Sequence, residues 1–92
     1  MARVIPFDQL RPGMTVWEDW RLGTGCLMME VIAKLQNGAV EVVWRDERGY
    51  GPGGQTEGRT WLRPNRDFRY WNQEPTMEQR QFTPWTEGSE SD

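Results

Sequence analysis

Few residues in this chain have side chains that could carry out chemistry, and their spacing does not assemble a catalytic site. The sequence contains no His, and its only serines, Ser89 and Ser91, lie at its C-terminal end. Serine and cysteine nucleophiles need a neighbouring base, which is usually a histidine. Cys26 is the single cysteine, which excludes an internal disulfide and the usual zinc site of nitrogen and sulfur ligands. We interpret Cys26 as a thiol that packs as a small apolar residue.

Two pairs of neighbouring carboxylates, Glu18-Asp19 and Asp46-Glu47, are the remaining candidates for acid–base or magnesium chemistry. Adjacent residues on a strand point to opposite faces of the sheet. We therefore expect solvated surface acids at these positions and no paired site. The glycines after Asp46 include no Gly-Lys-Ser/Thr motif and so do not predict phosphate binding. The sequence predicts a protein that is not an enzyme and that has no metal or cofactor.

The composition is that of one small polar domain. The chain has 92 residues, of which 36% are hydrophobic, and six are tryptophan. Its mean hydropathy is -0.85, so the large tryptophan side chains must supply much of the core. No apolar run approaches the roughly 20 residues of a membrane span, and the N-terminus lacks the apolar segment of a signal peptide. The sequence predicts a cytoplasmic protein with no membrane contact.

Charge divides the chain into two parts. Residues 1–71 carry a net charge of +1, and residues 72–92 carry -4 and few aliphatic side chains. Such acidic, polar segments seldom form a core. We predict a small β-barrel domain at 1–71 and an acidic C-terminal extension at 72–92.

Alternating apolar and polar residues predict the strands that would position any site. The longest runs from Cys26 to Gln36, with Leu27, Met29, Val31, Ala33 and Leu35 on one face. Asn37-Gly38 then predicts a type I′ hairpin turn, in which both residues have positive φ. The returning strand, 39–45, alternates Val40, Val42 and Trp44 against polar residues.

Shorter strands are expected at about 14–17, 59–63 and 68–71. A single turn is expected near 6–10 and a glycine-permitted bend at 20–25. Residues 46–58 hold five glycines in thirteen positions and predict a long mobile loop. The predicted fold is mostly β: a small five-stranded antiparallel, strongly bent sheet or partly open barrel with an irregular C-terminal extension.

The stretch from Arg11 to Leu62 contains Pro-Gly-Met-x-Val, Gly-x-Gly before a long apolar strand, a tight glycine turn, Val-x-Val-x-Trp and Thr-Trp-Leu. It resembles the small Tudor-like or Src-homology-three-like β-barrels. That resemblance implies a domain that binds peptides, other proteins or nucleic acid and does no chemistry. In being rich in Trp and Arg and free of His, the chain also resembles accessory proteins of bacteriophages and mobile elements, some of which inhibit host nucleic-acid-targeting defences.

A candidate binding surface lies between residues 45 and 71. It combines six arginines with three aromatic residues: Arg45, Arg48, Arg59, Arg63, Arg66 and Arg69, with Tyr50, Trp61 and Tyr70. These side chains are suited either to phosphates and stacked bases or to a protein interface. Four acids in the same stretch leave a local net charge of +2, and the pI is near 4.9, so a protein partner is favoured over nucleic acid. Alternatively, the tryptophans only pack within the sheet and the arginines only solubilise it.

The C-terminal extension carries two large aromatic residues, Phe82 and Trp85, around Pro84. They either pack back onto the barrel and cover an open edge, or form a short linear motif for another protein. The candidate partner-binding residues are Arg48, Tyr50, Arg59, Trp61, Arg63, Arg66, Phe82 and Trp85.

We hypothesise a non-catalytic protein that acts through a protein–protein interface. Its most specific form is a phage-type inhibitor or modulator of a host nucleic-acid-handling or CRISPR-like defence complex. The alternative is a nucleic-acid-binding β-barrel that uses the Arg and aromatic surface of residues 45–71.

Overall fold

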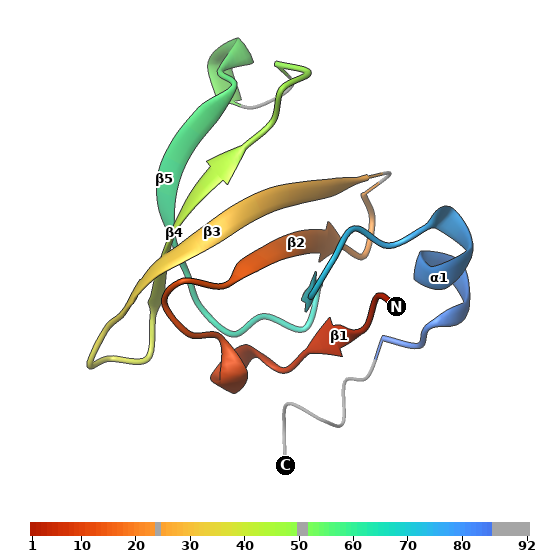
Figure 1. Cartoon of the computed structure of the whole chain (residues 1–92), viewed down its shortest axis with the longest axis horizontal. Coiled ribbons are helices and arrows are strands. Elements are labelled where there is room, and N and C mark those ends of the chain that lie inside the picture. The colour runs from red at the N-terminus through yellow and green to blue at the C-terminus, as the bar shows by residue number, and fades with distance from the viewer. Residues whose placement is uncertain (24, 50–51, 86–92) are drawn as a thin grey trace.

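A computed structural model describes residues 1–23, 25–49 and 52–85 as one antiparallel sheet with a short helix (Figure 1). Six strands follow the spatial order β1-β6-β2-β3-β4-β5, and the sheet is not closed. The strands are β1 (Val4–Ile5), β2 (Thr15–Trp20), β3 (Cys26–Lys34), β4 (Val40–Arg45), β5 (Glu57–Leu62) and β6 (Phe68–Trp71). Single 3-10 turns lie at Phe7–Gln9 and Pro52–Gly54, and the helix α1 spans Met77–Phe82. The predicted mostly β fold is confirmed.

The sixth strand, β1, was not expected from the sequence. It has two residues, Val4 and Ile5, and pairs with Trp71 and Tyr70 of β6. A two-residue strand is too short to show an alternating pattern, so only its partner reveals it. No helix in the described part of the chain is long and apolar enough to cross a membrane.

The hairpin between β3 and β4 lies at the predicted place but has a different turn. Among the described residues only glycines have positive φ, so Asn37 does not, while Gly38 has φ 90°. The Gly38 N–H donates to the Leu35 carbonyl at 3.1 Å, and the Leu35 N–H donates to the Ala39 carbonyl at 2.9 Å. This is a three-residue loop, a turn followed by a left-handed glycine. The type I′ prediction was wrong because Asn37 instead accepts the Ala39 N–H through its side chain at 3.0 Å.

A bulge in β3 changes which residues face the core. Val31 pairs with Val42 and Ala33 with Glu41, so the register shifts at Ile32. Val31 is fully buried, whereas Leu35 beyond the bulge is 37% exposed. The prediction that Leu35 shares the buried face was therefore wrong, because an inserted residue reverses the alternation beyond it.

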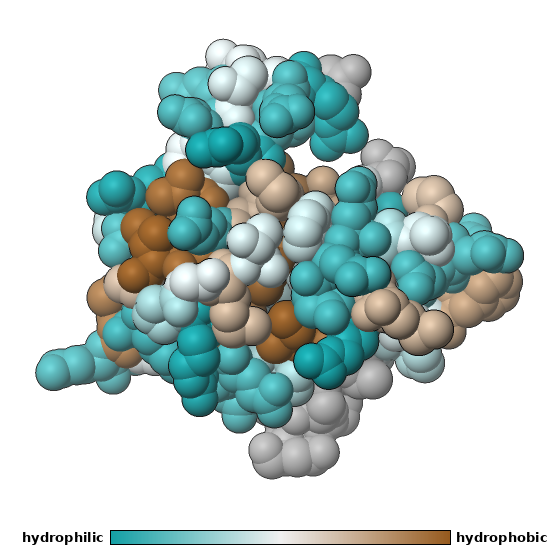
Figure 2. Space-filling model, viewed as in Figure 1, coloured by the Kyte–Doolittle hydropathy of each residue, from teal (hydrophilic) through white to brown (hydrophobic). Residues whose placement is uncertain are grey.

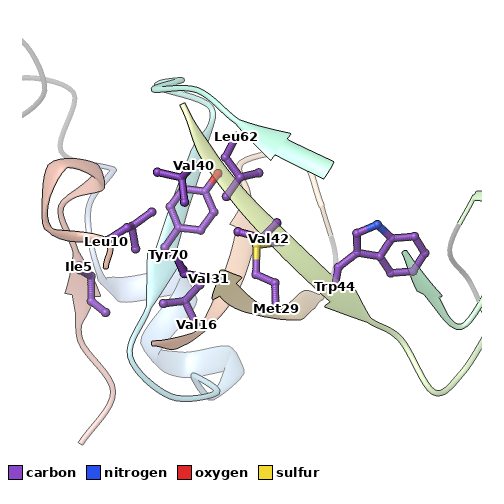
Figure 3. Close-up of a cluster of buried hydrophobic side chains, with 10 residues drawn as sticks. All are labelled: Ile5, Leu10, Val16, Met29, Val31, Val40, Val42, Trp44, Leu62 and Tyr70. Carbon is purple, nitrogen blue, oxygen red and sulfur yellow. The ribbon is translucent and has the colours of Figure 1, made fainter. Parts of the chain in front are cut away.

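The core lies on the inner face of the bent sheet (Figure 3). Its members come from all six strands and from the residue that follows the first turn: Ile5, Leu10, Val16, Met29, Val31, Val40, Val42, Trp44, Leu62 and Tyr70. The predicted inward positions on β4 are confirmed, since Val40 and Val42 are fully buried and Trp44 is 7% exposed. In Figure 3 the Trp44 side chain lies apart from the others, toward the far end of β4.

Trp44 is accommodated by a glycine on the neighbouring strand. Gly58 is its direct partner on β5, and a Cβ atom placed on Gly58 would lie 2.5 Å from Cζ2 of the indole. The loop predicted at 46–58 ends two residues early because Glu57 and Gly58 belong to β5. Gly58 is therefore a packing residue and not a loop residue.

Residues 72–85 lie against the outer face of the sheet beside β2 and β6. The helix α1 in this segment begins at a capping box, in which Thr76 and Gln79 bond reciprocally to each other's backbone N–H groups. Its position beside the end of β2 is visible in Figure 1. The segment thus places polar groups of the C-terminal part directly over one area of the sheet.

Candidate functional site

The outer face of the sheet has two parts that differ in what lies over them. We call the first the covered part: Asp19, Arg69 and Trp71, which lie beneath residues 72–85. We call the second the open part: the outward side chains of β4 and β5, namely Glu41, Val43, Arg45, Glu57, Arg59 and Trp61, with the adjoining Arg63. The alternation of β2, β4, β5 and β6 assigns these residues to the side opposite the core.

A buried charge cluster is at the centre of the covered part. The Asp19 carboxylate is fully buried and accepts hydrogen bonds from Arg69 Nε at 2.8 Å, Arg80 Nη2 at 2.7 Å and Trp71 Nε1 at 3.2 Å. Burial alone would raise the pKa of Asp19, but the hydrogen bonds from Arg80, Arg69 and Trp71 outweigh it and lower that pKa below its ordinary value. The prediction of solvated acids was wrong for Asp19, because two arginines distant in sequence enclose it, and for Asp46, which is also buried.

Arg69 joins the C-terminal segment to the sheet. Its guanidinium donates to the carbonyls of Thr83 and Arg80, each at 2.7 Å. It also lies 4.9 Å from the Trp71 ring centroid and 4.1 Å from that of Trp85. Arg69 is only 6% exposed, so it is not part of an exposed binding surface as predicted. Its contacts with Trp85 show that the tryptophan packs back onto the sheet.

The two aromatic residues of the C-terminal segment therefore differ. Trp85 is half-buried and also lies 5.0 Å from the guanidinium of Arg21. Phe82, at the end of α1, is 78% exposed. Of the two alternatives considered for this pair, packing onto the sheet describes Trp85 and does not describe Phe82.

A half-buried carboxylate lies on the inner face, where Glu18 faces Tyr70 across β2 and β6. The Tyr70 hydroxyl donates to Glu18 Oε2 at 3.2 Å. Burial raises the pKa of Glu18, partly offset by this hydrogen bond, and burial followed by the Glu18 charge raises the pKa of Tyr70. Tyr70 was expected on the binding surface, and its place in the core excludes it.

A groove of about 460 Å³ lies where the covered and open parts meet. Trp17 and Met28, which are directly paired across β2 and β3, lie on one side of it. Met77 and Arg80 line it from α1, and Arg48 lines it from the turn after β4. Figure 2 shows a hollow between the end of β4 and the rest of the molecule. The groove combines apolar and charged walls, a mixture typical of a recognition surface.

Cys26 also lines this groove, and its thiol is a weak candidate for a nucleophile. Burial, followed by the nearby Asp19 charge, raises the pKa of Cys26 to about 11. The thiol is therefore protonated at neutral pH and is a poor nucleophile. In residues 1–23, 25–49 and 52–85, no group of three or more His, Cys, Asp or Glu is placed to hold a metal ion.

In the open part, Trp61 lies on an exposed strand. Its side chain is 61% exposed, and its direct partner across the strands is Glu41. Arg59 lies on the same face and contacts Glu41 at 3.5 Å. Arg45 lies on the same face, and its direct partner across the strands is Glu57. The surface is thus an aromatic side chain bordered by both signs of charge.

The eight candidate residues occupy separate places. Arg59 and Trp61 lie together on β5 and Arg63 follows them, exposed. Arg66 and Trp85 line a small hollow of about 80 Å³ beside β1. Arg48 is at the groove, where its Nε contacts Asp46 Oδ1 at 3.0 Å. Phe82 is exposed on α1, and Tyr50 lies outside the described residues.

Sequence reasoning missed Asp19, Arg80 and the groove pair of Trp17 and Met28. The alternation Val16-Trp17-Glu18-Asp19 does place Trp17 and Asp19 on one face, and that signal was available. No local pattern connects Asp19 with Arg80, which are 61 residues apart. Comparisons of the chain with models of protein families, with curated proteins and with solved structures found no match.

Proposed function

We propose that this chain is a non-catalytic binding protein that holds a protein partner on the open part of its outer face. Trp61 would be the main anchor, with Arg59 and Arg63 beside it. The single observation that carries the proposal is the exposure of Trp61. It is the most exposed of the six tryptophans, at 61%, although it lies in a regular strand of the sheet.

An exposed tryptophan between arginines suits a protein interface better than it suits solvent. Tryptophan and arginine are the residue types most enriched among those that dominate binding energy. Trp20, the next most exposed at 49%, instead packs edge-on against Phe68 at a centroid distance of 6.2 Å. Burying Trp61 under a partner would remove a large apolar surface from water at low cost in side-chain entropy.

The charges of the open part favour a protein over nucleic acid. Arg59 contacts Glu41 at 3.5 Å, and Arg45 lies opposite Glu57. A polyanion approaching these arginines would meet the two carboxylates as well, which weakens the electrostatic term that dominates nucleic-acid affinity. A protein with charges of both signs can pair with each member of the surface.

The narrower hypothesis is that the partner belongs to a nucleic-acid-handling or defence complex and that binding inhibits it. The small antiparallel sheet supports a binding domain of the Tudor-like or Src-homology-three-like kind, within which this hypothesis lies. It predicts that purified complexes of that class lose nuclease or nucleic-acid-binding activity when the wild-type chain is added, and keep it when Trp61→Ala is added.

The proposal is tested by capture with matched variants. Immobilised wild-type chain, Trp61→Ala and Arg63→Ala are compared with Phe82→Ala, which removes an exposed aromatic residue elsewhere. We expect the wild type and Phe82→Ala to capture a protein that Trp61→Ala and Arg63→Ala do not capture. Binding to single-stranded DNA and RNA is measured in parallel by fluorescence anisotropy at about 150 mM salt.

Two results would contradict the proposal. Equal capture by the wild type and Trp61→Ala would place the interface elsewhere. Tight nucleic-acid binding that Arg63→Ala or Arg66→Ala abolishes would favour the alternative, a nucleic-acid-binding sheet.

A further inference from the structure

The edge strand β5 leaves one side of its backbone open. In the described part of the chain, β5 is the last strand of the sheet and pairs only with β4. Figure 1 shows no other element along its far side. The opposite edge of the sheet, β1, has two residues, whereas β5 has six. An edge strand of this length presents donors and acceptors that a further strand can pair with.

The pairing with β4 determines which backbone groups face this open edge. The Asp46 N–H donates to the Thr56 carbonyl at 2.7 Å, which makes them a hydrogen-bonded pair. Such pairs alternate along an antiparallel ladder with pairs that share no hydrogen bond. In the observed register, Glu57, Arg59 and Trp61 belong to the second kind. Their N–H and C=O groups therefore point away from β4, toward the free edge.

The side chains of the same residues carry an ordered sequence of charges. From Glu57 through Arg59 to Trp61, the outer face of β5 carries a negative, a positive and an aromatic side chain, and the positive Arg63 follows directly after the strand ends at Leu62. We propose that β5 pairs antiparallel with β5 of a second copy of the chain, about a twofold axis at Thr60. This pairing places Glu57 opposite Arg63 of the second copy and Arg59 opposite Trp61 of the second copy, twice each.

Charge selects this register over its neighbours. An axis at Arg59 would set Arg59 against the same residue of the second copy, and an axis at Trp61 would set Arg59 against Arg63. Like charges directly opposite each other destabilise a strand pair. An axis at Gly58 would pair only three residues within β5. The axis at Thr60 pairs residues 58–62 of the two copies. It sets Glu57 against the oppositely charged Arg63 and the Arg59 cation against the Trp61 ring.

The other face of the strand also tolerates this pairing. The axis brings Thr60 opposite Thr60 of the second copy, a favourable cross-strand pair. Gly58 would lie opposite Leu62 of the second copy. Gly58 has no side chain, and the Trp44 ring of its own chain lies over it. The two sheets would join into one, with two copies of the open part side by side. This inference does not depend on the proposed function and is tested with the purified chain alone.

The test is sedimentation velocity over a range of concentrations with charge-reversed variants of the full chain. The wild type is expected to show a concentration-dependent dimer. Glu57→Arg and Arg63→Glu each place like charges opposite each other twice, and each should weaken association about tenfold or more. Mixing these two variants restores unlike charges at both pairs, so the mixture should dimerise where neither variant does alone.

The mixture separates the proposed register from a folding defect. Glu57→Arg also places two positive charges opposite each other within one chain, because residue 57 is the strand partner of Arg45. Thermal melting of each variant reports any resulting loss of stability. Recovery of the dimer on mixing requires both variants to be folded. A wild type that is monomeric at all concentrations overturns the proposal. So does a dimer that neither single reversal weakens, or two weakened variants that do not associate when mixed although both melt cooperatively.

Discussion

The covered and open parts of the outer face contain similar residues and behave differently. Each has arginine, tryptophan and a carboxylate on neighbouring strands. In the covered part, Asp19 and Arg69 are at most 6% exposed and bond to each other at 2.8 Å. In the open part, the side chain of Arg59 is 64% exposed and lies 3.5 Å from Glu41. The two parts are alike in residue type, and they differ because residues 72–85 enclose the covered part and not the open part.

The energetic consequence is that the covered part should stabilise the fold and the open part should not. A buried ion pair is costly to disrupt, because removing one partner leaves an uncompensated charge in a dry environment. An exposed ion pair contributes little, since water and salt screen it. We therefore expect substitutions of the exposed side chains in the open part to cost little stability.

Asp19→Asn should produce the largest loss of stability. It removes the charge that Arg69 and Arg80 share, and we expect a loss of about 3–5 kcal/mol in the free energy of unfolding. Urea denaturation followed by tryptophan fluorescence measures it. Asp67→Asn is the control, because Asp67 is 56% exposed and lies 3.6 Å from Arg21. Its loss should not exceed about 1 kcal/mol. Equal losses in the two variants would contradict the distinction.

Gly58→Ala tests whether the open part depends on contacts beneath it. The added methyl group would lie 2.5 Å from the Trp44 ring, and we expect a loss of about 1–3 kcal/mol through overpacking. Gly25→Ala is the matched control, since its Cβ would meet nothing nearer than Arg48 Nη1 at 3.8 Å. Thermal melts of both variants measure the loss of stability. A melting temperature of Gly58→Ala equal to that of the wild type would show that the Trp44 side chain can move aside.

Trp85→Ala examines the cover itself. It removes the ring that lies 4.1 Å from the Arg69 guanidinium, and we expect a loss of about 2 kcal/mol for a desolvated cation–π contact. Phe82→Ala, three residues earlier and 78% exposed, should change the free energy of unfolding by no more than about 0.5 kcal/mol. Equal chemical denaturation midpoints for the two variants would mean that Trp85 does not hold the segment in place.

Acidification should weaken the covered part. The pKa of Asp19 is lower in the folded chain than its ordinary value of about 3.9, so the folded state binds this proton less well than the unfolded state. The stabilisation is complete above that ordinary value and is lost as pH falls through the lower, folded pKa. Glu18 has a raised pKa and acts in the opposite sense, losing stability as pH rises. Denaturation between pH 2 and pH 7 should show a steeper acid loss in the wild type than in Asp19→Asn, and parallel curves would exclude Asp19 as the cause.

Trp61→Ala should have the smallest effect on stability. Because the side chain is 61% exposed, the free energy of unfolding should change by no more than about 0.5 kcal/mol. A larger loss, measured by urea denaturation followed by circular dichroism, would assign Trp61 to the fold and remove the main argument for an interface.

The strand pattern was readable because alternation is local. Val40, Val42 and Trp44 were predicted inward and are buried, and β6 begins and ends at the predicted residues 68 and 71. The hairpin position followed from Gly38, whose positive φ few other residues adopt. The bulge at Ile32 and the two-residue strand β1 were not readable, because each depends on a partner strand and not on its own sequence.

The sequence by itself determined a small antiparallel sheet, its main hairpin and the absence of histidine chemistry, because propensity and composition act over a few residues. Only the tertiary structure decided which arginines, tryptophans and acids are buried. The sequence around Asp19 predicts a surface acid, but in the folded chain Arg80, which is 61 residues later, lies 2.7 Å from its carboxylate. The burial of a charge depends on whether distant groups can compensate it, and that is a property of the folded arrangement. Trp61 is exposed for the complementary reason, because no part of the described chain reaches across the open part to cover it.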